Sequence, residues 1–205
     1  MDAWAPFRYV LTKVHFPMYK SQMARSIAAL LPEHGRVLDV GCDTGAVAKA
    51  IMAHKPGLEI VGVDIPSQRP AEIERFTYDG KKLPFDDGSF DVVMANDVLH
   101  HLPSRAAIHE LVREMRRVSR RDLLIKEQTH YDPLTWTVIS FNDWITNAPY
   151  GIRCTYQFQT KAQWKELFAA LELDIIEHSS DGLNFGVGGG ELFNPIFTVR
   201  RRDAW

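Results

Sequence analysis

The residues best suited to chemistry lie in residues 37–45, which read Val-Leu-Asp-Val-Gly-Cys-Asp-Thr-Gly. A predicted apolar strand carries an acid, Asp39, and then turns through Gly41 and Gly45 into a predicted helix. Such a turn places backbone N–H groups and the positive end of a helix beside a ligand. The Asp39 carboxylate would repel a dinucleotide pyrophosphate and attract a ligand that carries ammonium and sulfonium groups.

Two further acids, Asp64 and Asp79, follow the next two predicted strands. Ligands of open α/β sheets bind beyond the carboxyl ends of the strands, so the three acids are expected at one site. Asp64 follows Gly41 by 64 − 41 = 23 residues, the spacing at which a carboxylate accepts both ribose hydroxyls. Asp79 could accept from an adenine amino group. An aspartate at a strand end is also a common turn former, and that interpretation stays open for each acid.

Short apolar segments that alternate with helical patterns predict a parallel sheet flanked by helices. The expected strands span residues 36–40, 58–63, 75–78, 91–96, 122–126, 174–178 and 194–200. The expected helices span residues 45–54, 104–119 and 161–171, with one or two more in 8–31. Ser104 is the expected N-cap of the second of these helices. Because no helix separates the last two strands, the final strand is expected to return antiparallel beside its predecessor.

The motifs of residues 35–127 resemble, in order, those of class I methyltransferases that use S-adenosylmethionine (SAM). The resemblance rests on Asp39-x-Gly41-x-x-x-Gly45, Asp64 after a strand, Tyr78-Asp79-Gly80-x-x-Leu83-Pro84-Phe85-x-x-Gly88-x-Phe90-Asp91-Val92-Val93 and Val98-Leu99-His100-His101-Leu102. The chain looks most similar to the branch that includes ubiquinone- and menaquinone-pathway C-methyltransferases and many small-molecule methyltransferases.

This resemblance implies one domain over residues 1–205, with a Rossmann-like, doubly wound, seven-stranded α/β sheet whose last strand is antiparallel. It implies methyl transfer (EC 2.1.1) from SAM to a small-molecule acceptor, with S-adenosylhomocysteine as the product. No metal ligands are expected. The implied cofactor-binding residues are Asp39, Val40, Gly41, Cys42, Gly45, Asp64, Ile65, Asp79, Gly80 and Asn96.

Asp43 departs from the family pattern, which usually has glycine there. Aspartate tolerates left-handed backbone angles better than most residues, so the turn can survive. Its carboxylate would, however, lie near the carboxylate of the SAM methionyl group. This feature favours the alternative of a non-catalytic, SAM-fold binding or regulatory protein. An NAD site is disfavoured because Thr44 stands where Gly-x-Gly-x-x-Gly requires its last glycine.

Candidates for catalysis follow the fifth predicted strand. His130 could act as a base near neutral pH, and Tyr131 lies next to it. A solvent-exposed loop histidine is an equally good interpretation of His130. His100 and His101 are expected to be packed histidines rather than catalytic ones.

Residues 129–160 form a predicted aromatic insertion on the substrate side of the domain, and residues 1–35 a predicted helical lid that carries Tyr19 and Lys20. Within the insertion, one helical stripe is expected to pack in the core: Leu134, Val138, Phe141 and Ile145. Three interpretations stay open for Trp136, Asp143 and Trp144 on the rest of that helix: an aromatic or lipid-like acceptor pocket, a dimer contact, or packing on the N-terminal helices.

Composition narrows the function classes. The net charge is −2, so no long-range field favours nucleic acid or an anionic membrane as a partner. Two cysteines, Cys42 and Cys154, are too few for a disulfide framework and favour a reducing compartment. The first residues lack a signal-peptide pattern, and no apolar stretch is long enough for a transmembrane helix. A cytoplasmic location is therefore expected, while the oligomeric state stays unknown.

Overall fold

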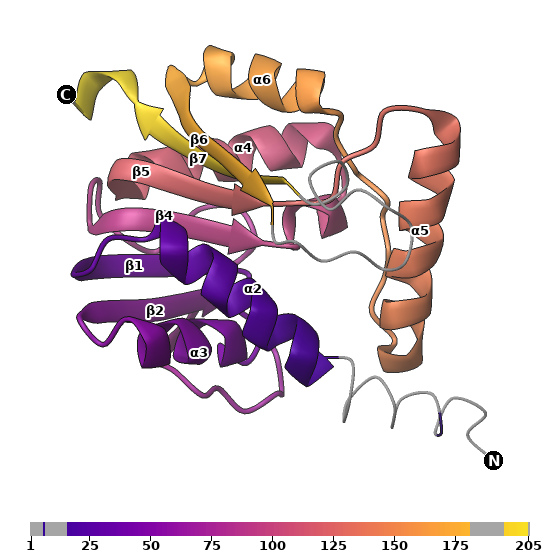
Figure 1. Cartoon of the computed structure of the whole chain (residues 1–205), viewed down its shortest axis with the longest axis horizontal. Helices are drawn as coiled ribbons and strands as arrows, with labels where there is room; N and C mark the ends of the chain where they lie inside the picture. Colours follow the sequence, from indigo (N-terminus) through magenta and orange to yellow (C-terminus); the bar gives the residue numbers. More distant parts are fainter. Residues whose placement is uncertain (1–5, 7–15, 181–194, 205) are drawn as a thin grey trace.

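The computed structural model describes residue 6, residues 16–180 and residues 195–204, and a seven-stranded sheet lies at its centre (Figure 1). The strands are β1 Gly35–Val40, β2 Leu58–Asp64, β3 Arg75–Thr77, β4 Phe90–Asn96, β5 Ser119–Lys126, β6 Leu173–Ser180 and β7 Pro195–Arg201. The α-helices are α2 Phe16–Leu30, α3 Ala46–His54, α4 Arg105–Val118, α5 Pro133–Asn147 and α6 Lys161–Ala170. The short 3₁₀ helices are η2 Leu99–His101, η3 Ala148–Tyr150 and η4 Arg202–Ala204.

The strand order is β3-β2-β1-β4-β5-β7-β6. Strands β1 to β5 pair in parallel, whereas β7 is antiparallel to both β5 and β6. The order reverses between β1 and β4, and such a switch point is where open α/β sheets bind ligands. The Rossmann-like, doubly wound sheet with an antiparallel last strand is thereby confirmed.

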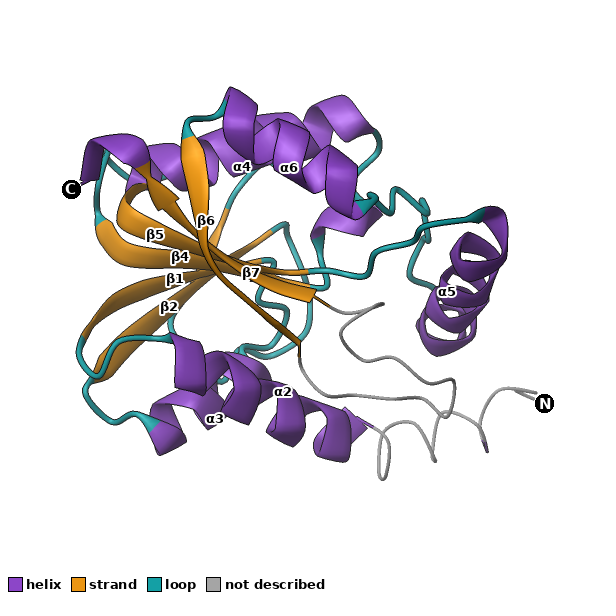
Figure 2. Ribbon diagram, turned by 45° about the horizontal axis from the view of Figure 1, so that its top comes forward, coloured by secondary structure: helices purple, strands orange, loops and turns teal. Residues whose placement is uncertain are grey.

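Helices cover both faces of the sheet, with α2 and α3 on one face and α4 and α6 on the other (Figure 2). Successive strand residues point to opposite faces, so β1 serves both layers. Val37 packs with α2 and α3, and Leu38 packs with α4 and α6. Helix α4 buries one apolar stripe, namely Ile108, Leu111, Val112, Met115 and Val118. Ser104 caps this helix as expected, because its side chain accepts from the Ala107 backbone N–H at 3.2 Å.

Helix α5 contradicts the expected core stripe of the insertion. Leu134 is 72% exposed and Phe141 is 59% exposed, and Val138 is exposed as well. The helix instead buries the opposite side, through Ile139, Ser140 and Asp143. The apolar residues do recur at helical spacing, but α5 stands beyond the ends of the strands rather than on a face of the sheet (Figure 1). A polar group inside the molecule, described below, decides which side of α5 is buried.

Within the described part of the chain, no helix combines the length and the apolar character needed to cross a membrane.

Candidate cofactor site at the carboxyl edge of the sheet

The glycine turn after β1 adopts the backbone that its residues permit. Gly41 has φ 73° and Gly45, the N-cap of α3, has φ 77°. A Cβ on Gly41 would lie 2.2 Å from Val98 Cγ2, so only glycine fits there. Asp43 takes φ 51°, which confirms that aspartate supports the left-handed conformation at this position. The turn therefore brings the chain close to the segment that follows β4.

The extra carboxylate of Asp43 is paired. Its Oδ2 accepts from Arg69 Nη1 at 2.5 Å, and its backbone oxygen accepts from Arg75 Nη1 at 2.6 Å. Both side chains of the Asp43–Arg69 pair are partly exposed. The negative charge that the sequence placed beside the turn is thus offset by a cation, which weakens the case that Asp43 closes the site.

Asp39 and Asn96 meet at the ends of β1 and β4. Asn96 Nδ2 donates to Asp39 Oδ1 at 3.3 Å. Asp39 is only 3% exposed, and burial, aided by the charge of Asp64, raises its pKa to about 7. Asn96 Oδ1 is buried without a hydrogen-bond partner among the described residues. These two acceptors, one anionic and one neutral, suit a ligand ammonium group.

Asp64 closes the other side of the turn. Its Oδ2 accepts from the Asp43 backbone N–H at 2.6 Å and its Oδ1 from that of Ile65 at 2.7 Å. Burial raises the pKa of Asp64, and these two N–H groups oppose the shift. Each carboxylate oxygen keeps a further acceptor site, so the group fits a pair of ribose hydroxyls.

Asp79 behaves as a turn former in this structure. Its exposed side chain accepts from the backbone N–H groups of Lys81 at 2.9 Å and Lys82 at 3.2 Å, and these bonds lower its pKa. Beside it, a Cβ on Gly80 would lie 3.7 Å from Ile65 Cγ2, with nothing closer. Ile65 itself is more than half exposed. An apolar side chain next to an open glycine suits the face of a flat ring such as adenine.

The remaining implied cofactor residues, Val40 and Cys42, are buried. Val40 packs in the core, and the Cys42 backbone N–H donates to the Val63 oxygen. Burial raises the pKa of the Cys42 thiol well above its ordinary value. These two residues shape the turn, and burial keeps the Cys42 thiol neutral.

A buried ion pair that the motifs did not indicate lies beside Asn96. Lys126 Nζ donates to Asp97 Oδ2 and to Tyr19 Oη, both at 2.5 Å, and Tyr19 Oη donates to Asp97 Oδ2 at 2.5 Å. Burial opposes the charge on Asp97, yet Lys126 lowers its pKa. The group ties α2 to the ends of β4 and β5. Of the predicted lid, residue 6 and residues 16–35 are described, and the rest lies outside the described residues.

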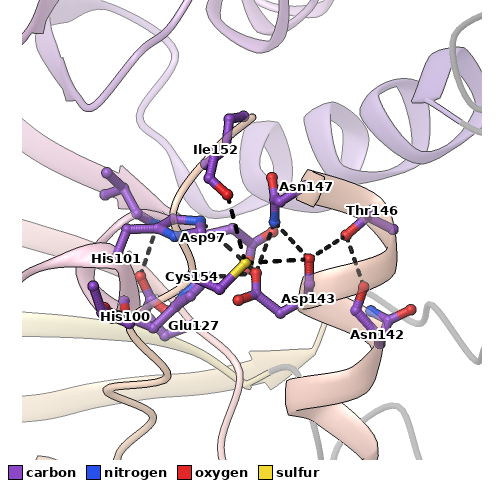
Figure 3. Close-up of polar contacts among 12 residues, drawn as sticks. Asp97, His100, His101, Glu127, Asn142, Asp143, Thr146, Asn147, Ile152 and Cys154 are labelled. Atoms are coloured by element: carbon purple, nitrogen blue, oxygen red, sulfur yellow. Dashed lines mark hydrogen bonds and ion pairs between the residues drawn. The ribbon is translucent and has the colours of Figure 1, made fainter. Parts of the chain in front are cut away.

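A second buried polar group, which we call the histidine cluster, consists of His100, His101, Glu127 and Asp143 (Figure 3). His100 Nδ1 is 2.6 Å from Glu127 Oε2, and His100 Nε2 is 3.4 Å from Asp143 Oδ1. Burial opposes a charge on His100, but the two carboxylates outweigh it and raise the pKa of His100 to about 10. The expectation of a packed His100 is confirmed. Glu127 and Asp143 carry no local motif, so sequence spacing could not have paired them with it.

The candidate catalytic residues lie between β5 and α5. His130 is half-buried, and its Nδ1 has no hydrogen-bond partner in the described part of the chain. Tyr131 is more exposed, and burial of part of its side chain raises its pKa to about 12. Hydrogen bonds join Asp39 to Asn96 and Asp43 to Asp64, whereas His130 and Tyr131 occupy a separate loop.

Comparison with known proteins agrees with this geometry. A family model described as "Methyltransferase domain" matches residues 18–178. The chain belongs to this family. Together with the fold, the match assigns it to the class I SAM-dependent methyltransferases, and the strand-end acids and the glycine turn fit that cofactor.

Individual relatives cover less of the chain. A 2-methyl-6-phytyl-1,4-hydroquinone methyltransferase of Synechocystis is 35% identical over 40% of this chain and 29% of its own length. A probable tRNA methyltransferase 9B of Homo sapiens is 30% identical over 40% of this chain and 18% of its own. The chain thus spans less than a third of each of these relatives. The crystal structure of a SAM-dependent methyltransferase from Methanosarcina mazei matches with a TM-score of 0.64 at 18% identity, covering 85% of this chain and 96% of that one, which shows the shared fold.

Proposed function

We propose that this protein transfers the methyl group of SAM to a small acceptor of aromatic or lipid-like character. The observation that carries the proposal is the surplus of negative charge at the switch point. Asp39 and Asp64 face a cationic ligand there without a basic side chain hydrogen-bonded to either carboxylate in the described residues. SAM, when bound, supplies an electrophilic methyl group.

Each part of the proposed site has one task. Asp39 and Asn96 hold the ammonium of the methionyl portion, and Asp64 accepts the ribose hydroxyls. Ile65 and Gly80 provide the surface for adenine, with Asp79 at its amino edge. Arg69 offsets the charge of Asp43, so the methionyl carboxylate is not repelled. Burial of Asp39 strengthens its attraction for a cation because the local dielectric is low.

The acceptor side is proposed to lie between the β4 and β5 ends and α5. Trp136 and Trp144 are partly exposed, and the Trp136 ring lies 6.2 Å from the ring of Tyr156. Aromatic side chains of this kind bind flat or apolar ligands. The Synechocystis relative is named for a prenylated hydroquinone, which combines both properties. His130 is proposed to take the acceptor proton where one must leave, because its Nδ1 is buried without a hydrogen-bond partner among the described residues.

Calorimetry with SAM and S-adenosylhomocysteine tests the cofactor. Micromolar binding of both is expected, because the two ligands share every contact except those of the methyl group and its charge. A folded protein that binds neither would favour the alternative, a non-catalytic member of the fold. The second experiment is a screen for transfer of labelled methyl to hydroquinones, phenols and lipids, with tRNA as the competing class because one relative is named for it. Transfer to tRNA alone would overturn the small-molecule assignment.

A further inference from the structure

The histidine cluster has the composition and the support of a metal centre. His100, His101 and Asp143 each offer one ligand atom, and these atoms all lie within 4.8 Å of one another. His100 and His101 are neighbours in η2, and both turn Nε2 toward Asp143 Oδ1, at 3.4 and 3.8 Å. In a tetrahedral zinc centre with bonds of about 2.0–2.1 Å, neighbouring ligand atoms are about 3.3–3.4 Å apart. The two histidine–Asp143 separations are close to this spacing.

The contacts behind the ligands are those that a metal centre requires. Glu127 Oε2 lies 2.6 Å from His100 Nδ1, while Glu127 Oε1 accepts from the backbone N–H groups of Val98 and Leu99. The arrangement commits Nδ1 to donating its proton to Glu127, so Nε2 would offer a lone pair to an ion that replaces its own proton. A carboxylate that orients a histidine in this way is the common support of a bound metal. Asn147 Nδ2 donates to Asp143 Oδ1 at 2.8 Å and holds that side chain in place.

The cluster contains two buried carboxylates and one carboxylate oxygen without a hydrogen-bond partner among the described residues. The buried carboxylates of Glu127 and Asp143 carry two negative charges, which a proton on His100 offsets in part. Asp143 is 2% exposed, and its Oδ2 has no hydrogen-bond partner among the described residues. A buried carboxylate oxygen without a donor is an open position for a cation. A divalent ion would balance the two charges and satisfy all three ligand atoms.

The cluster is also accessible. A surface pocket of about 470 Å³ adjoins it, lined by His101, Pro103, Arg153, Cys154, Thr155 and Gln157. The Cys154 thiol lies 3.7 Å from the Asp143 backbone oxygen, beside the ligand set. His101 therefore stands between the buried cluster and the pocket, which provides a path for an ion.

We propose that His100, His101 and Asp143 bind one zinc-type divalent transition-metal ion. Two imidazoles and a carboxylate, with a thiol nearby, favour this class over Mg²⁺ or Ca²⁺, which prefer all-oxygen ligand sets. The site lies outside the strand-end acids that are assigned to SAM. The competing occupant is a proton shared by His100 between the two carboxylates.

Cobalt titration of the full, tag-free protein after chelator treatment tests the proposal, since Co²⁺ absorbs visibly in zinc sites. One equivalent is expected to bind, with displacement by Zn²⁺. The variants His101→Ala and Asp143→Asn should each weaken Co²⁺ binding at least about tenfold, because even residues that only support a ligand contribute 10–100-fold. His109→Ala, a histidine of α4 outside the cluster, is the matched control and should bind as the wild type does.

Circular dichroism of each variant shows whether it is folded before its affinity is compared. Asp143→Asn keeps the shape of the side chain, and His101 is only half-buried, so both variants are expected to fold. A folded wild type that takes up no Co²⁺ would overturn the proposal in favour of the shared proton. Undiminished binding in both folded variants would overturn it as well, because the ion would then sit elsewhere.

Discussion

The carboxyl edge of this sheet holds two polar regions that handle charge in opposite ways. At the ends of β1 and β2, an amide donates to Asp39 and two backbone N–H groups donate to Asp64. No cation forms a hydrogen bond with either carboxylate among the described residues. At the ends of β4 and β5, the acids face cationic groups of the protein itself, with Lys126 on Asp97 and His100 between Glu127 and Asp143. We call the first the acidic side and the second the balanced side.

This difference indicates that the acidic side serves ligand binding and the balanced side serves the stability of the fold. A buried acid without a protein cation is destabilising until a ligand supplies the positive charge, so the acidic side is suited to a cationic cofactor. On the balanced side the opposite charges hold α2, the end of β5 and α5 together. Loss of one partner should therefore damage the fold on the balanced side and ligand affinity on the acidic side.

The largest effect is expected for Lys126→Met on the balanced side. The change leaves the buried Asp97 charge uncompensated, which costs about 3–5 kcal/mol of unfolding free energy. Urea unfolding at pH 7 measures this loss. The double variant Asp97→Asn, Lys126→Met should recover part of it. A loss below about 1 kcal/mol in the single variant would contradict the structural role given to this pair.

Asp64→Ala should act mainly on the cofactor. Hydrogen bonds to a charged group contribute about 1.5–3 kcal/mol, so SAM affinity should fall by that amount. Calorimetry measures the change, with Glu59→Ala on the same strand as the control, because Glu59 is exposed and forms a surface ion pair with Arg36. Unchanged affinity in Asp64→Ala would remove the ribose assignment.

The pH dependence of stability distinguishes the two sides directly. An unfolded aspartate titrates near pH 4, whereas the pKa of folded Asp39 is raised to about 7. The folded state therefore holds this proton more tightly, so the stability that Asp39 contributes is present below about pH 4 and is lost as pH rises through 7. The variant Asp39→Asn keeps an acceptor for the hydrogen bond from Asn96. Its side chain does not titrate, so the variant does not lose stability as the pH rises. Its stability relative to the wild type, followed by urea unfolding without ligand, should increase from pH 5 to pH 8; a constant difference would argue against a protonated Asp39.

The smallest effect is expected for Arg69→Ala. The Arg69–Asp43 pair is partly exposed, and such pairs contribute about 0–1 kcal/mol to stability. Stability should therefore barely change. SAM affinity should fall slightly, because the Asp43 charge is no longer offset. Calorimetry with SAM on Arg69→Ala and on Asp64→Ala compares the affinities of the two variants. A greater loss of affinity in Arg69→Ala than in Asp64→Ala would mean that Arg69 binds the ligand itself.

Sequence reasoning predicted that the residues of the acidic side lie together at one edge of the sheet. Asp39, Gly41, Gly45 and Asp64 lie within short segments whose geometry depends on neighbours in the chain. A strand, a glycine turn and a helix start in fixed order, and parallel strands bring their carboxyl ends to one edge. The antiparallel return of the last strand followed for the same reason, since no helix separates β6 from β7 in the sequence pattern.

The balanced side was out of reach because its partners are distant in the chain. Three separate segments supply this cluster: η2 carries His100, α5 carries Asp143, and Glu127 directly follows β5. No local spacing in the sequence relates these residues. The stripe of α5 shows the same limit. Its period of 3.6 residues was evident, yet a period does not say which side of a helix meets the protein.

The sequence by itself determined the class of sheet, the glycine turn and the position of the acids at the ends of β1 and β2, because these depend on backbone conformation and on the order of elements. Only the tertiary structure decided that Asp43 pairs with Arg69, that Lys126 is buried against Asp97, and that α5 turns Asp143 inward and Phe141 outward. The physical reason is that a buried charge must meet a partner, and the partner is chosen by the three-dimensional packing of distant segments.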